Sequence, residues 1–173
     1  MRPRGFALFE TAIGTCGIAW SDGGIVSVQL PERDGAATRA RLLVRSDGAR
    51  ETLPPPGVQR AIDAIVSLLG GESSDLSFIA LDMEGVPDFH RRVYEVARTI
   101  PPGATQPYGE IAARLGDPGS ARAVGQALGR NPFPIVVPCH RVLAAGGRTG
   151  GFSARGGTKT KLTLLAIEGA QLF

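Results

Sequence analysis

The chain has 173 residues, of which 43% are hydrophobic and 20% are charged, and its formal net charge is +3. This composition is typical of a folded globular protein of one or two domains and excludes a disordered or low-complexity chain. We find no signal peptide and no apolar run long enough to span a membrane, so we expect a reduced, cytoplasmic setting.

The first half of the chain predicts a small α+β domain. We expect strands within residues 6–31 and 76–83, and helices over 35–44 and 57–71. The first segment alternates apolar and polar residues around an Asp22-Gly23-Gly24 turn, as in a β-hairpin. The second helical segment ends at Gly70-Gly71, a typical helix end. These elements predict an N-terminal domain over residues 1–85.

The second half, residues 86–173, predicts mainly helices. Apolar residues recur at helical spacing in residues 87–103, 107–116, 121–131 and 158–170. The predicted inward faces include Ile111 and Ala112, then Val124, Ala127 and Leu128, and in the last helix Leu162, Leu165 and Ala166. Ser120 is placed to cap the third of these helices. The second and third helices, joined by a tight glycine-containing turn, have the outline of a helix-turn-helix.

Charge is divided unevenly between the two halves. Residues 1–85 carry 8 Arg against 11 acidic residues, a net charge of −3. Residues 86–173 carry 9 Arg and 2 Lys against 5 acidic residues, a net charge of +6. Beside a helix-turn-helix pattern, this excess favours contact with nucleic acid. On charge alone, a solvated basic face remains an equal alternative.

The two cysteines have different sequence surroundings. Cys16 lies within a strand pattern, which favours a structural role. Cys139 follows Pro138, which ends the strand-like run 134–137, and it is followed directly by His140 and Arg141. A thiol becomes a nucleophile only as a thiolate, which needs a base or a positive charge nearby. A buried thiol beside an incidental histidine is the alternative that these residues leave open. Two histidines are too few to indicate a Cys/His zinc site.

Three segments carry a resemblance to a known family. The runs TQPYGEIAARLG, SARAVGQALGRNPFPIVVPCHRV and AIEG, within residues 105–169, resemble the O6-alkylguanine-DNA alkyltransferases, or methylated-DNA–protein-cysteine methyltransferases. The resemblance implies a ribonuclease-H-like domain over 1–85 and a helical domain with a helix-turn-helix over 86–173. It further implies a monomer that flips alkylated guanine out of double-stranded DNA from the minor groove and takes the alkyl group once, irreversibly, without a metal or other cofactor.

The same resemblance assigns roles to particular residues. Cys139 is similar to the alkyl acceptor, and His140 to a base that deprotonates it through a water molecule. Glu168 matches the acid that orients this histidine. Tyr108 matches a tyrosine that contacts DNA near the flipped base and its 3′ phosphate and donates a proton to guanine N3. Asn131 matches a hinge before the active-site strand.

Further residues match the DNA and the substrate contacts of the family. Arg122 resembles an arginine that fills the space left by the flipped base, and Ser120, Ala121 and Ala123 are its DNA-facing neighbours. The backbone carbonyls of Cys139 and Val142 would accept hydrogen bonds from the guanine amino group, and Ser153 and Pro134 join them as substrate contacts. Arg141 is interpreted as structural.

Three other functions compete with this interpretation. A DNA-binding regulator would use its cysteine only structurally or as a redox sensor. A non-catalytic lesion-binding protein would lack the cysteine, whereas the PCHRV run is intact here. A cysteine hydrolase would have no use for the helix-turn-helix. The segment from Ser153 to Glu168 is longer than is usual in the family, so the range of alkyl groups that fit stays open.

Overall fold

The computed structural model describes residues 3–170 and divides the chain into two compact units. The first unit comprises Met1–Glu84 and Pro132–Val136, and the second comprises Gly85–Asn131 and Val137–Phe173. The division after residue 84 lies beside the border predicted from the sequence. The short segment that belongs to the first unit was not expected. Within the described residues, no helix is both long and apolar enough to cross a membrane.

The first unit is built on a sheet with the strand order β3-β2-β1-β4. Its elements are β1 (Gly5–Thr11), β2 (Gly14–Ser21), β3 (Gly24–Gln29), α1 (Gly35–Arg45), β4 (Arg50–Glu51) and α2 (Pro56–Leu69). The strands β1, β2 and β3 pair antiparallel in sequence order, which confirms the predicted hairpin pattern. The short β4 pairs parallel with β1 and was missed, because two exposed polar residues give no strand signal.

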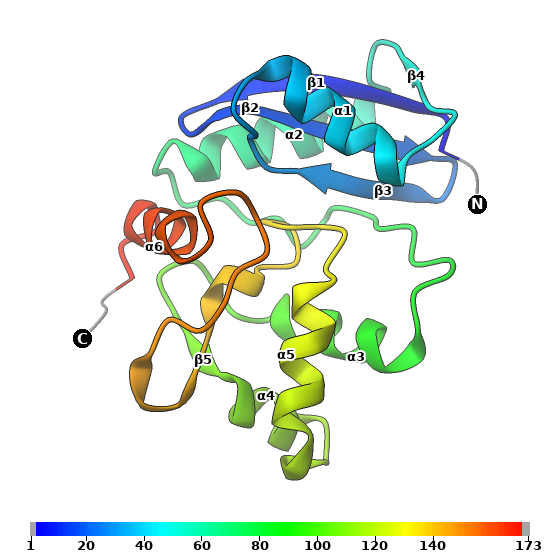
Figure 1. Cartoon of the computed structure of the whole chain (residues 1–173). Coiled ribbons are helices and arrows are strands. Elements are labelled where there is room, and N and C mark those ends of the chain that lie inside the picture. Colours follow the sequence, from blue (N-terminus) through cyan, green and yellow to red (C-terminus); the bar gives the residue numbers. More distant parts are fainter. Residues whose placement is uncertain (1–2, 171–173) are drawn as a thin grey trace. The chain divides into compact units, whose positions relative to one another are not determined.

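Helices α1 and α2 lie on opposite faces of this sheet, with α1 in front and α2 behind it in Figure 1. Phe6 and Ala19 are paired across β1 and β2 and pack with Leu42 of α1 in one buried cluster. Gly17 lies on the same face, where an added Cβ would come within 2.9 Å of a Leu42 methyl group. The bare backbone at Gly17 therefore lets α1 approach the sheet closely.

The strand predicted over residues 76–83 is absent. Only Leu81 forms a β-bridge, to Ile25 of β3, flanked by the hydrogen bonds Ile25 N to Ala80 O (2.9 Å) and Asp82 N to Ile25 O (2.8 Å). A turn that closes from Leu76 to Ile79 interrupts the segment before it can extend along the sheet. The apolar residues of this run hold the segment against β3 at a few points and do not form a continuous ladder of strand hydrogen bonds.

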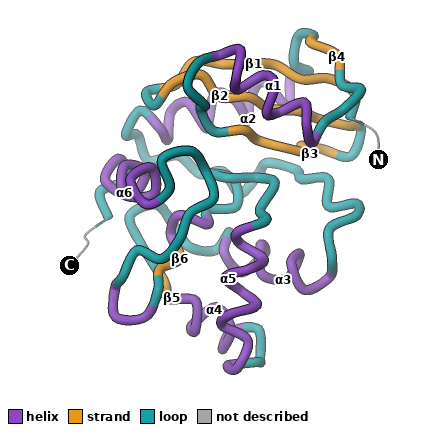
Figure 2. The backbone as a smooth tube through the Cα atoms, in the orientation of Figure 1, coloured by secondary structure: helices purple, strands orange, loops and turns teal. Residues whose placement is uncertain are grey.

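The second unit is mainly helical and is shown by element type in Figure 2. Its elements are α3 (Asp88–Ala97), β5 (Gln106–Pro107), α4 (Tyr108–Arg114), the 3₁₀ turn η1 (Pro118–Ser120), α5 (Ala121–Gly129), the 3₁₀ turn η2 (Cys139–Arg141), β6 (Val142–Leu143), the 3₁₀ turn η3 (Ala145–Gly147) and α6 (Thr158–Ile167). The helices α3, α4 and α5 pack together around apolar residues that include Ile111 and Val124. The buried Tyr94 hydroxyl donates a 2.7 Å hydrogen bond to Ala127 O and joins α3 to α5.

Two local predictions near α5 are wrong. Ser120 precedes α5, but its hydroxyl donates to Asp117 O (2.7 Å) instead of capping the helix, because the residues before it already form η1. Residues 134–137 form a turn rather than a strand, with Ile135 at a φ of 74°. This left-handed conformation is rare for a β-branched residue and is held here by burial of the side chain.

The inward face of α6 also differs from the prediction. Leu164 and Leu165 are buried, but Leu162 is 37% exposed and Ala166 is exposed. The third position that completes the buried face is Lys161, whose residue exposure is 0%. A helical pattern that assumes polar residues point outward is shifted by one position when a lysine lies inward.

Candidate active site

Cys139 begins the turn η2, directly after Pro138. Burial raises the pKa of its thiol, and four influences oppose that rise: a hydrogen bond from the Asn131 side chain, the positive charge of Lys161, and the backbone N–H groups of Cys139 and His140. Each of these stabilises a thiolate more than a thiol. The site is therefore buried and apolar in part, yet arranged around a negative charge on sulfur.

Asn131 follows α5 and lies at the join between that helix and the segment that leads to Cys139. The residue is 7% exposed, and its side-chain amide donates a 2.9 Å hydrogen bond to Val137 O. This bond fixes the amide two residues before the cysteine. Asn131, which the sequence predicts as a hinge residue, thus links the two ends of the segment 131–137 through its side chain.

His140, Glu168 and Arg141 form a buried polar cluster behind the cysteine. His140 Nε2 lies 2.7 Å from Glu168 Oε1. Arg141 makes a bidentate pair with the same carboxylate, through Nε to Oε2 (2.9 Å) and Nη2 to Oε1 (2.7 Å), and also donates to Ile100 O (2.7 Å). Bidentate geometry of this kind fixes the carboxylate in direction as well as position.

The protonation states of this cluster follow from its contacts. Burial favours a neutral Glu168, but the hydrogen bonds from His140 and Arg141 outweigh it and lower the pKa of Glu168 to about 2. Burial lowers the pKa of His140, although Glu168 opposes the shift. A neutral His140 that donates from Nε2 to Glu168 presents a lone pair at Nδ1. This Nδ1 is buried and makes no hydrogen bond within residues 3–170.

Tyr108 is brought to the same site by the parallel pairing of β5 with β6, in which Pro107 faces Leu143. It lines a cavity of about 570 Å³ in the second unit. The cavity is lined by Tyr108, Ala121, Arg122, Gly125, Gln126, Leu128, Gly129, Cys139, Gly151, Phe152 and Ser153. Its volume is in the usual range for a small-molecule site. Burial, and then the charge of Cys139, raise the pKa of Tyr108, so this phenol keeps its proton.

The residues singled out from the sequence fall into three groups. Tyr108, Ala121, Arg122, Cys139 and Ser153 line the cavity. The Asn131 side chain and the His140 backbone N–H act on Cys139, and Glu168 contacts the His140 ring. Ser120 and Ala123 are the chain neighbours of the lining residues Ala121 and Arg122, and Val142 O accepts a hydrogen bond from Lys161. Pro134 belongs to the first unit, so its part in a substrate site stays a prediction.

Sequence reasoning missed Lys161, whereas Arg141, interpreted as structural, holds the Glu168 carboxylate and Ile100 O. Lys161 lies seven residues before Glu168, which is two helical turns and therefore the same face of the segment. That spacing was the available signal. Among residues 3–170, no group of three metal-binding side chains occurs.

Comparison with known proteins identifies the family. The family described as "6-O-methylguanine DNA methyltransferase, DNA binding domain" matches residues 88–170. The methylated-DNA–protein-cysteine methyltransferase of Methanothermobacter thermautotrophicus is 38% identical over 156 residues, which are 90% of this chain and 80% of that protein. The chain belongs to the methylated-DNA–protein-cysteine methyltransferase family. The member from Mycolicibacterium paratuberculosis is 41% identical over 150 residues, 85% of this chain and 88% of its own length.

Solved structures of this family have the same mixed α/β fold. The OGT protein of Mycobacterium tuberculosis, crystallised in complex with DNA, matches with a TM-score of 0.75 at 34% identity, over 95% of this chain and 92% of that one. The O6-methylguanine-DNA methyltransferase of Pyrococcus kodakaraensis matches with a TM-score of 0.70 at 29% identity, over 95% and 99% of the two chains. The likeness thus extends over both units and is not confined to the cysteine motif.

Proposed function

We propose that this protein repairs DNA directly by accepting the alkyl group of O6-alkylguanine on Cys139. The observation that carries the proposal is the position of Cys139 in the wall of a base-sized cavity, with the His140–Glu168 pair behind it. A soft thiolate suits attack on an alkyl carbon, and the family assignment supports the same reaction. No metal or other cofactor is needed for this step.

The proposed reaction is a displacement in which one proton replaces one alkyl group. The Cys139 proton passes through a water molecule to Nδ1 of His140, while Glu168 and Arg141 hold the imidazole in place. The thiolate then forms a C–S bond as the bond between the alkyl carbon and O6 breaks, and that electron pair stays on guanine. Tyr108 donates a proton to N3, so guanine leaves neutral, and the phenol recovers its proton from His140 or from water. Because a thioether has no easily broken bond, each molecule reacts once.

The DNA side of the proposal uses α4 and α5 as a helix-turn-helix. Arg122 is exposed in the first turn of α5 and also lines the cavity, so it is placed both to meet DNA and to mark the entrance. We expect α5 to enter the minor groove, with Arg122 filling the space of the flipped base. Flipping costs a few kcal/mol, part of which this contact offsets.

The remaining expectations follow from the same site. All the proposed reacting residues belong to one chain, so a monomer is sufficient. Both cysteines are free, which fits a reducing cytoplasm in which the thiol stays available.

Intact-protein mass spectrometry tests this function. After incubation with a duplex oligonucleotide that contains one O6-methylguanine, we expect a gain of one methyl group, mapped to Cys139, in the wild type and in Cys16→Ala. Cys139→Ala should gain none while still binding the duplex. If the wild type binds the lesion tightly without a mass change, the protein is a lesion sensor or a DNA-binding regulator and the proposal is wrong.

A further inference from the structure

Lys161 is a lysine without a carboxylate partner in the interior of the second unit. Its residue exposure is 0%, and within residues 3–170 no Asp or Glu lies within salt-bridge distance of its ammonium group. A buried charge without a counter-ion costs several kcal/mol, so such residues are rare in structural roles. Its position therefore needs a functional explanation.

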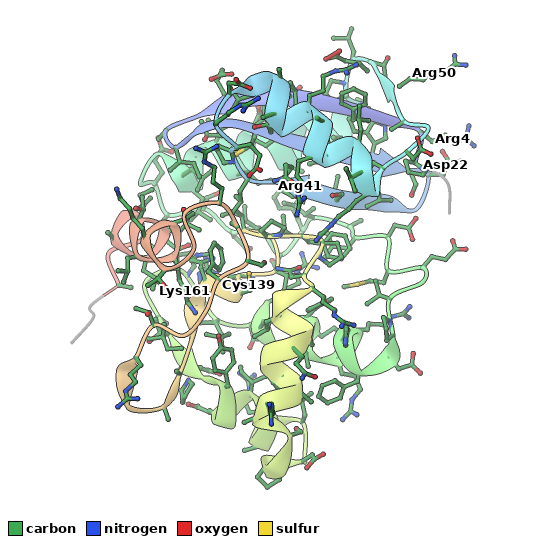
Figure 3. All side chains as sticks on the ribbon, in the orientation of Figure 1. Arg4, Asp22, Arg41, Arg50, Cys139 and Lys161 are labelled. Carbon is green, nitrogen blue, oxygen red and sulfur yellow. The ribbon has the colours of Figure 1, made fainter. Side chains whose placement is uncertain are left out.

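The ammonium group of Lys161 links the backbone after the Cys139 turn to a loop that lines the cavity. Nζ donates to Val142 O at 2.7 Å and reaches Gly151 O at 3.4 Å. Val142 begins β6, directly after the turn that carries Cys139, and Gly151 lines the cavity from the loop that follows η3. Nζ also lies 5.7 Å from the centre of the Tyr108 ring. Cys139 and Lys161 are both labelled in Figure 3, where they lie in the same part of the second unit.

Among residues 3–170, the ionisable groups around Lys161 include one that becomes negatively charged before the alkyl group is transferred. The turn η2, which packs against α6, contributes Cys139, His140 and Arg141, and α4 contributes Tyr108. Arg141 is paired with Glu168, the acidic residue at the far end of α6, and His140 also contacts that carboxylate. Tyr108, whose pKa is raised, keeps its proton until the bond between the alkyl carbon and O6 breaks. The anion left for Lys161 is the thiolate of Cys139.

We propose that Lys161 is a positioning residue of the alkyl transfer, which holds Val142 O and Gly151 O around the cavity and supplies the positive charge that stabilises the Cys139 thiolate. The inference rests on the proposed function for the identity of the alkyl donor. The coupling between the Lys161 and Cys139 side chains does not depend on that function. In this inference His140 removes the proton of the Cys139 thiol, and Lys161 stabilises the negative charge that remains on the sulfur.

The protonation of Lys161 supports this division. Burial lowers its pKa from the usual 10.5 to about 8, and the negative charge of Cys139 opposes the fall. The support for the thiolate is present while Lys161 is protonated and is lost as the pH rises through about 8. Thiol reactivity that depends on Lys161 should accordingly level off above this pH, although thiolates in general become more abundant there.

The composition of the chain makes the coupling directly measurable. Lys159 and Lys161 are the only lysines in the sequence, so lysine labelled with ¹³C at Cε gives two resonances, which the Lys159→Met variant assigns. In the wild type we expect the Lys161 resonance to titrate near pH 8. In Cys139→Ala its midpoint should fall by about one pH unit, a tenfold change in the protonation constant. A Lys161 midpoint that is unchanged in Cys139→Ala, or that lies in the ordinary lysine range, would overturn the inference.

A second experiment measures the effect on the cysteine itself. The rate of Cys139 alkylation by iodoacetamide is followed from pH 6 to 9.5 in the wild type, in Lys161→Met, and in Lys159→Met as the matched control on the exposed side of the same helix. We expect Lys161→Met to react about tenfold more slowly at neutral pH. In this variant the rise of the alkylation rate with pH, the rate limb, should move to higher pH. Lys159→Met should match the wild type. If Lys161 only fastened the loop, its loss would raise the rate at every pH without moving the limb, and the electrostatic role would be wrong.

The two proposals fail in different ways. Iodoacetamide needs no DNA, so a Lys161-dependent thiol that takes no methyl group from O6-methylguanine would refute the repair function alone. Normal methyl transfer in a Lys161→Met variant with an unchanged pH profile would refute the Lys161 inference alone. Should Lys161→Met fail to fold, the lysine titration in the wild type and in Cys139→Ala still decides.

Discussion

The two cysteines of this protein are both free and both buried, yet their surroundings differ. Cys16 lies within β2, where its backbone is paired with Phe9 and its sulfur is 3.8 Å from Thr11 Oγ1. Burial raises the pKa of this thiol to about 12, a contact with Thr11 opposes the shift weakly, and the charge of Glu10 adds to it. Around Cys139, by contrast, an amide, a cation and two backbone N–H groups all favour the thiolate.

This difference shows that burial alone does not determine whether a cysteine is structural or reactive. A strand engages its N–H groups in the ladder, so they are unavailable to a side chain. The first residues of a helical turn have N–H groups without intrahelical partners, and these can point at a sulfur. Cys139 begins such a turn, where its own N–H also donates to Val137 O (2.8 Å), whereas Cys16 lies within a strand.

The largest expected contrast is in reaction with a thiol reagent on the folded protein. At pH 8, a thiol with a pKa of about 12 is ionised to roughly one part in 10,000, and the strand covers it as well. We expect iodoacetamide to modify Cys139 more than about a thousandfold faster than Cys16. Peptide mapping of the modified protein measures both rates in one sample. Equal rates at the two sites would remove the distinction on which the active site is built.

The next largest effect concerns the carboxylate behind His140. Glu168→Gln leaves Arg141 buried without its bidentate partner and His140 without its orienting acceptor. We expect methyl transfer from O6-methylguanine to slow by about a thousandfold, within the range of general-base contributions. Single-turnover quench measurements give the rate. Glu95→Gln, on the exposed side of α3, is the matched control and should react like the wild type.

The fold could be read from the sequence where apolar periodicity was regular. The antiparallel strands around Asp22-Gly23-Gly24, and the helix that ends at Gly70, follow from alternation and glycine placement. The segments 76–83 and 134–137 could not be read in this way. Both are apolar and short, and their conformation depends on a few tertiary contacts, such as the bridge between Leu81 and Ile25, which no local pattern encodes.

The candidate site was predictable to the extent that its motif was specific. Cys139, His140 and Glu168 were found through the resemblance, and the structure brings His140 and Glu168 together across 28 residues of chain. Lys161 was missed because amphipathic patterns treat lysine as an outward residue. The shifted face of α6, with Leu162 exposed, has the same cause. Buried charges at functional sites are where pattern reasoning fails.

A smaller effect is expected from acid titration of the same cluster. The pKa of Glu168 is lowered from 4.5 to about 2 in the folded protein, so its ionised form stabilises the fold above the unfolded value, and this contribution is lost as the pH falls from about 4.5 to 2. The shift corresponds to about 3 kcal/mol of unfolding free energy. Urea denaturation at several pH values should show this dependence in the wild type and a flatter one in Glu168→Gln. A variant with the same acid dependence as the wild type would place the stabilising charge elsewhere.

The smallest expected effect is at the other cysteine. Thr11→Val removes the hydroxyl beside Cys16 Sγ and also the hydrogen bonds Thr11 Oγ1 to Gly14 O (2.7 Å) and Ile13 N to Thr11 Oγ1 (3.2 Å), which close the turn between β1 and β2. We expect a loss of about 1 kcal/mol in unfolding free energy, the usual net value for such bonds, measured by urea denaturation.

Cys16 should stay unreactive toward iodoacetamide, because burial in the strand, not Thr11, sets its pKa. Methyl transfer to Cys139 should keep its wild-type rate. If Thr11→Val instead slowed methyl transfer, the polar contact at Cys16 would be part of the repair chemistry, and the contrast between a structural and a reactive cysteine would have to be abandoned.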